Sequence, residues 1–262
     1  MISFRLTARP VLMFGLALTA YAGATQPPAR PDSVAREAVV RMTIADLEKG
    51  LKSSPAAPAM AAVKRYYPEE YRLMLEEMLA RIKASDGSFA AAHLIGAESM
   101  RAFMLRRVPE LVNAPPALLN RINRGQLELM RSLAGNQVGL CAEYATTGFT
   151  GKTPLPAPYL AQTGALSVLM IEASRAGADR PREAGRGTLN NEDAVAWYQA
   201  VHRVGTAKDV IDAFEANGPP SPDMSCRMGI AVYAAIDALP SEQAARLSAY
   251  FFKTAMSGEA PK

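Results

Sequence analysis

Apolar residues recur at the spacing of an amphipathic helix over most of this chain, and proline or glycine marks the breaks between the runs. The first run spans residues 33–53 and carries Val40, Ile44, Leu47 and Leu51. Further runs cover residues 58–67, 68–85, 88–108, 117–146, 159–176, 195–201, 207–217, 226–236 and 241–251. No segment alternates apolar and polar residues as a half-buried strand does. The pattern predicts an all-α protein of eight to ten helices.

Local signals indicate where several of these helices begin. Pro68 suits the first turn of a helix, and the two glutamates after it suit the positive end of the helix dipole. Ser88, after the stop signal Asp86-Gly87, is expected to cap the next helix. Asn190 or Asn191 is expected to cap another, and residues 206–209 match the capping-box spacing.

The first 24 residues differ from the rest of the chain. Arg5 and Arg9 precede an apolar run over residues 11–22, which ends in small residues that fit an A-x-A cleavage site. The run is about 12 residues long, short of the roughly 20 that a membrane-spanning helix needs. We therefore expect a cleaved signal peptide over residues 1–24 and a periplasmic or secreted protein. No cysteine follows the run, so we expect no lipid anchor. Because the run is short and expected to be cleaved, we expect no stable membrane insertion either.

The remainder predicts a tether followed by one helical domain. Residues 25–32 contain three prolines and predict an extended tether, and the fold is expected over residues 33–257. Residues 148–158 contain three prolines and two glycines, which predicts a loop between possible halves at 33–147 and 159–257. We favour a single irregular domain, because a covalent bridge between the halves would tie them together.

The two cysteines supply that bridge. Cys141 and Cys226 lie in the exported part, where oxidising conditions allow disulfides to persist. A bridge would close a loop of about 85 residues and stabilise the fold by roughly 4 kcal/mol on the chain-entropy argument. The alternative is a pair of buried, unbridged thiols. A redox-active pair is disfavoured, since the cysteines lack C-x-x-C spacing.

Charge and composition exclude some functional classes. Without the leader's two arginines, 27 of the 29 basic residues remain against 25 acidic ones, and this balance disfavours a nucleic-acid partner. His93 and His202 each stand apart from other metal ligands, so we expect no metal site. Neither a G-x-S-x-G elbow nor a phosphate-binding loop is present, so we expect no cofactor.

One acidic residue supports an enzymatic hypothesis. Glu98 is followed by Ser99 on a predicted helix, and this pair resembles the helical Glu-Ser of lysozyme-like lytic transglycosylases. The resemblance implies cleavage of peptidoglycan, with a buried Glu98 as general acid. It covers two residues, and the segment that usually accompanies them further along the chain is missing. The other interpretation of Glu98 is an ion pair with Arg101 on the same helical face.

Arginines gather in one predicted loop. Arg180, Arg182 and Arg186 lie between residues 178 and 187, and their planar guanidinium groups suit carboxylates or phosphates on a partner. A solvated linker is the alternative. The aromatic pairs at residues 66–67 and 197–198 are expected in the core and its rim, or on a binding surface.

The pattern as a whole favours a non-catalytic exported protein that binds another protein of the cell envelope, as an inhibitor, protective partner or assembly factor. A peptidoglycan-cleaving enzyme that uses Glu98 and a small-molecule carrier remain alternatives. The oligomeric state does not follow from the sequence.

Overall fold

The computed structural model describes residues 33–149, 153, 155–182, 186–204, 208–216 and 218–257. The predicted signal peptide and tether lie outside these residues. Within them the structure contains thirteen α-helices and no strand, so the all-α prediction is confirmed. None of the described helices is both long and apolar enough to cross a membrane.

The helices belong to two compact units, each built from more than one stretch of the chain. Unit 2 contains the described residues up to 107 and residues 153–172, whereas unit 1 contains residues 108–149 and those from 173 onward. One boundary between the units falls within the loop predicted at residues 148–158, and two others follow Arg107 and Glu172.

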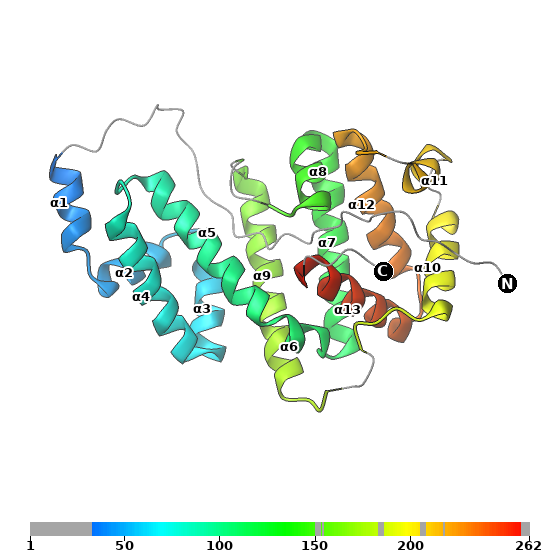
Figure 1. Ribbon diagram of the computed structural model, residues 1–262, viewed down its shortest axis with the longest axis horizontal. Coiled ribbons are helices and arrows are strands. Elements are labelled where there is room, and N and C mark those ends of the chain that lie inside the picture. Colours follow the sequence, from blue (N-terminus) through cyan, green and yellow to red (C-terminus); the bar gives the residue numbers. More distant parts are fainter. Residues whose placement is uncertain are drawn as a thin grey trace. The chain divides into compact units, whose positions relative to one another are not determined.

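Unit 2 is built mainly from the first five helices (Figure 1). These are α1 (Ser33–Arg41), α2 (Ile44–Lys52), α3 (Ala57–Tyr66), α4 (Pro68–Ala84) and α5 (Phe89–Arg106). The first 16 residues of α9 (Ala157–Ala178) also belong to this unit.

The first predicted helix is in fact two helices. Thr43 begins α2 with a capping box, in which its hydroxyl accepts from the Asp46 amide and the Asp46 carboxylate accepts from the Thr43 amide. The helical run predicted over residues 33–53 is interrupted here, and Val40 is 58% exposed instead of buried. The periodicity prediction missed this signal because the apolar spacing continues across the break.

The boundaries predicted around α4 and α5 are confirmed. Pro68 lies in the first turn of α4, and the Ser88 hydroxyl accepts from the Ala91 amide at the start of α5. Gly87 between the helices has φ of 74°, a left-handed conformation that favours glycine. Phe89, the first residue of α5, is 70% exposed.

Unit 1 contains the remaining helices. They are α6 (Val108–Val112), α7 (Pro116–Asn136), α8 (Val138–Thr146), the end of α9, α10 (Asn191–Arg203), α11 (Lys208–Glu215), α12 (Pro222–Asp237) and α13 (Ser241–Ser257). The long helix predicted over residues 117–146 breaks at Gln137, whose backbone leaves helical geometry at φ −140° and ψ 53°. Breaks of this kind explain why there are more helices than predicted. The predicted capping box at Thr206 lies outside the described residues.

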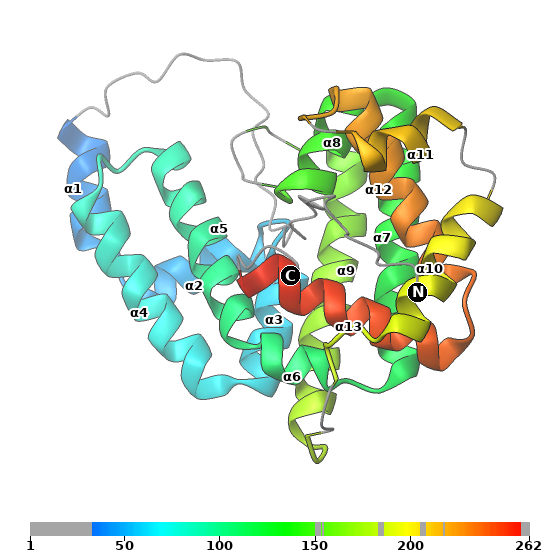
Figure 2. The ribbon, with the colours of Figure 1, turned by 45° about the vertical axis from the view of Figure 1, so that its right-hand side comes forward.

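Helix α12 lies at the centre of unit 1. It packs against α7, α8, α10, α11 and α13, and it runs beside α8 in both views of the ribbon (Figures 1 and 2). A disulfide joins Cys141 of α8 to Cys226 of α12, and both side chains are buried. The predicted bridge is therefore confirmed, but it lies within unit 1 and does not join two units.

Candidate functional site

The predicted arginine loop borders a small polar cavity in unit 1. The cavity has a volume of about 120 Å³ and is lined by Pro109, Glu110, Asn113, Gly177, Ala178, Arg180 and Arg182. These residues come from α6, from the residue that follows it, from the last turn of α9 and from the segment after α9. The cavity thus forms where two helix ends meet.

Gly177 allows these helix ends to meet closely. A Cβ atom on Gly177 would lie 1.9 Å from the carbonyl oxygen of Glu110 and 2.9 Å from the amide nitrogen of Ala114. Both are backbone atoms, which cannot rotate aside as a side chain can. Only glycine therefore permits this spacing between α6 and α9, and the cavity depends on it.

Asn113 holds the segment that carries the arginines. Its side-chain amide donates to the carbonyls of Gly177 at 2.9 Å, Arg180 at 3.2 Å and Pro181 at 3.3 Å. The carbonyls at the end of a helix have no partner within the helix, so a buried amide there stabilises the turn that follows. Asn113 is 4% exposed, which means that this contact is made away from water. The backbone at Arg180 and Pro181 is thereby fixed.

The structure brings together two of the three predicted arginines. Arg180 and Arg182 line the cavity, whereas Arg186 does not. The turn at Gly187, beside Arg186, packs against Val112 and the Lys253 side chain. Among the described residues that line the cavity, two arginines stand against one carboxylate, that of Glu110. Such a site suits an anionic group.

Arg182 is the arginine most open to a ligand. Its side chain is exposed, and it makes no ion pair with any residue that the structure describes. A guanidinium offers donors in a planar fork that matches a carboxylate in a bidentate manner. Because the backbone around Arg182 is held by Asn113, little ordering of the main chain is needed when it binds.

Glu98 lies elsewhere, on α5 of unit 2. It forms an ion pair with Arg81 of α4, and 49% of its side-chain surface is exposed. The sequence predicts either a buried general acid or a pair with Arg101, and the partner in the structure is an arginine of the neighbouring helix. The burial that the general-acid hypothesis predicts is therefore not seen at this residue.

Each histidine lies beside an aromatic ring. The ring of His93 stacks on Phe89 with centroids 6.3 Å apart, and burial lowers the pKa of His93 below its usual value. The ring of His202 meets Tyr198 edge to face with centroids 4.5 Å apart. Among the described residues, no group of three or more His, Cys, Asp or Glu side chains could hold a metal ion.

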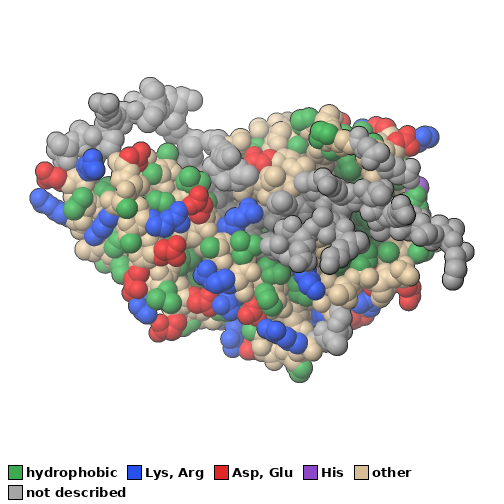
Figure 3. All heavy atoms as spheres, viewed as in Figure 1, with side chains coloured by type: hydrophobic (Ala, Val, Ile, Leu, Met, Phe, Trp, Pro, Cys, Tyr) green, Lys and Arg blue, Asp and Glu red, His purple; other side chains and the backbone are tan. Residues whose placement is uncertain are grey.

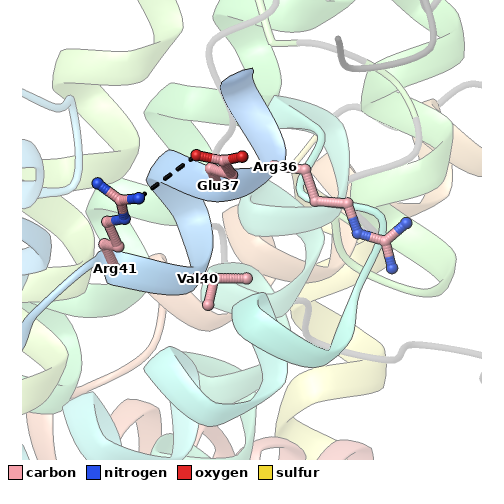
Figure 4. Close-up of a pocket in the computed structure, with 4 residues that line it drawn as sticks. All are labelled: Arg36, Glu37, Val40 and Arg41. Atoms are coloured by element: carbon pink, nitrogen blue, oxygen red, sulfur yellow. Dashed lines mark hydrogen bonds and ion pairs between the residues drawn. The ribbon is translucent and has the colours of Figure 1, made fainter. Parts of the chain in front are cut away.

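The charged surface elsewhere consists largely of local pairs. On the face shown in Figure 3, basic and acidic side chains are interspersed. A hollow beside α1 is lined by Arg36, Glu37, Val40 and Arg41, and Figure 4 shows Arg36 pointing away from the Glu37–Arg41 ion pair. All four residues belong to one helix, so the described residues close this hollow on one side only.

Comparison of the chain with protein-family models, with curated proteins and with solved structures finds no match. Sequence reasoning found Arg180 and Arg182 but missed Glu110, Asn113 and Gly177. The one signal available for the close contact between α6 and α9 was Gly177, which directly follows the helical run predicted over residues 159–176.

Proposed function

We propose that this protein is exported and acts in the cell envelope by binding another protein, without catalysing a reaction. The leader-like pattern of residues 1–24 supports export. The disulfide between Cys141 and Cys226 supports it too, because such bonds persist mainly in oxidising compartments. We propose the cavity bordered by Arg180 and Arg182 as the contact site.

The observation that carries this proposal is the exposed guanidinium of Arg182 beside a cavity whose backbone is fixed by Asn113. Arginine on a preorganised backbone recognises carboxylates well, since few degrees of freedom are lost on binding. The partner is therefore expected to present an Asp or Glu side chain, or its own terminal carboxylate, to this cavity. Its affinity should fall as salt screens the charges.

The test compares two charge reversals. Tagged protein carrying Arg182→Glu, and a control carrying Arg131→Glu, are each expressed in the source cells and chemically cross-linked there. Arg131 is an exposed residue of α7 with no ion pair in the described part of the chain. Mass spectrometry should find an envelope protein that the unchanged chain and the Arg131 variant capture alike, and that Arg182→Glu loses by about tenfold or more. Capture that is equal in all three would overturn the proposal.

The other hypotheses gain less support from the described residues. The Glu98–Arg81 ion pair favours a structural role for Glu98. The candidate cavity, at about 120 Å³, is smaller than the roughly 300 to 1,000 Å³ of typical small-molecule sites. The hollow beside α1 is larger, at about 460 Å³, but its described lining comes from one helix. The enzymatic hypothesis is tested by incubating the protein with peptidoglycan and measuring the release of soluble fragments. Activity that disappears in Glu98→Gln would favour an enzyme over a binding protein.

A further inference from the structure

Helix α10 carries an exposed apolar and aromatic stripe on the face that points away from the core of unit 1. Val195, Tyr198 and His202 recur at the i, i+3, i+7 spacing of one helix face. Val195 is 49% exposed and Tyr198 37% exposed, and His202 is exposed as well. The opposite face contains the buried residues Ala200 and Val201, where α10 packs against α12 and α13.

Two opposite charges flank this stripe at its ends. Glu192 and Arg203 are eleven positions apart, which is close to three whole turns, so both lie on the same flank of the helix. At 1.5 Å per residue they are about 16 Å apart along the axis. Both side chains are exposed, and neither forms an ion pair with a residue that the structure describes, although Glu192 is near enough to Arg246 of α13 to help raise the pKa of that arginine.

We infer that α10 is a self-association surface and that its occupant is α10 of a second copy, arranged antiparallel about a two-fold axis. The midpoint between Glu192 and Arg203 falls between Trp197 and Tyr198. An axis at that point brings Glu192 of each copy to Arg203 of the other, so one flank supplies two ion pairs. In such an isologous contact the same patch meets itself, which requires this kind of internal complementarity. A parallel arrangement would instead set like charges side by side.

The apolar residues fit the same arrangement. With the axis beside Tyr198, the Val195 side chain of each copy meets the Tyr198 and His202 rings of the other. Aromatic side chains contribute much of the energy of protein contacts at low cost in conformational entropy. The apolar stripe would thus be covered while both flanking charges are neutralised.

The size of α10 limits the strength of this contact. One side of a 13-residue helix offers roughly 300 Å² per copy, against about 800 Å² per partner in a stable interface. The dimer is therefore weak, with a dissociation constant on the order of 100 µM, and it forms where the protein is locally concentrated.

A charge-swap experiment tests this inference. Sedimentation velocity is measured from about 10 µM to about 1 mM on the unchanged chain and on variants of Glu192 and Arg203. Glu192→Arg and Arg203→Glu should each weaken association by about fivefold or more, because each creates like-charge contacts. The double variant should recover the original affinity within about twofold, because its pairs are reversed but intact. An equimolar mixture of the two single variants should associate as well.

Three controls establish that a change in association comes from this surface. Glu128→Arg, an exposed change on α7, should leave association unaltered. Arg182→Glu should leave it unaltered too, which keeps this inference independent of the proposed function. Circular dichroism melts establish that each variant is folded. A monomer at every concentration, unaffected single variants, or a double variant that stays as weak as the singles would each overturn the inference.

Discussion

Replacing Gly177 with alanine tests the close contact on which the cavity depends. The new Cβ would lie 1.9 Å from the Glu110 carbonyl oxygen, and even a tight contact requires 3.0 Å. The two backbones must therefore separate by about 1.1 Å or more, because neither atom can rotate out of the way. Separation would loosen the packing of α6 on α9 and the hydrogen bonds of the Asn113 amide.

Overpacking of this kind costs typically 1 to 3 kcal/mol, and a clash between backbones belongs at the upper end, at about 3 kcal/mol. The helical preference of alanine returns at most about 1 kcal/mol, so the net loss is about 2 kcal/mol or more. Gly135 provides a matched control, because it is also the residue before the last in its helix and has no atom within 4 Å of its built Cβ. Gly135→Ala should stabilise the protein by about 0.5 kcal/mol.

The assay is urea unfolding followed by far-UV circular dichroism, which gives the free energy of unfolding of each variant. Gly229→Ala should be intermediate, since its Cβ would lie 2.4 Å from the Met130 Cε, which can move, and 2.8 Å from the Ala145 Cβ, which is more constrained. The reasoning would be refuted if Gly177→Ala were as stable as the unchanged chain. It would also be refuted if Gly135→Ala lost as much stability as Gly177→Ala.

Two further predictions concern stability. Replacing Cys141 and Cys226 together with alanine should lower the free energy of unfolding by roughly 4 kcal/mol, measured in urea, because the bridge closes a long loop. Since both cysteines are buried, reductant should reach the bridge only when denaturant opens unit 1, as alkylation and mass spectrometry would show. Burial lowers the pKa of His93, so the unfolded chain binds a proton more readily than the folded one. The neutral form of His93 contributes stability above pH about 6.5, and that contribution is lost as the pH falls below this value. The free energy of unfolding of His93→Phe, measured in urea at several pH values, should therefore depend less on pH.

The helices themselves were largely predictable from the sequence because local signals determine them. Pro68, Ser88 and Asn190 each begin a helix as predicted, through groups that act on the nearest turn. The missed breaks have different causes. Thr43 carries a capping signal that apolar periodicity hides, and Gln137 has no recognisable stop signal beyond the nearby glycines. Periodicity describes which face is apolar, and it does not report where a helix changes direction.

The candidate site was predictable only in its charges. Arg180 and Arg182 stand out in the sequence because basic residues are concentrated there. Asn113 is 64 positions from Gly177, and nothing near it in the sequence indicates that its amide caps the end of α9. Contacts of this range depend on how α6 and α9 pack, which local patterns do not contain.

At the cavity, the arginines supply the charge, whereas Gly177 sets the position of the backbone that carries them. Two substitutions can therefore test the two contributions separately. Arg182→Glu removes the charge but leaves the contact between Gly177 and Glu110 intact, so it should abolish capture of the partner with little change in stability. Gly177→Ala keeps every arginine but displaces the backbone that orients them, so it should reduce capture and stability together. If Gly177→Ala destabilised unit 1 and still bound the partner normally, the arginines would be acting as a flexible charged segment, and the preorganised cavity would have no part in recognition.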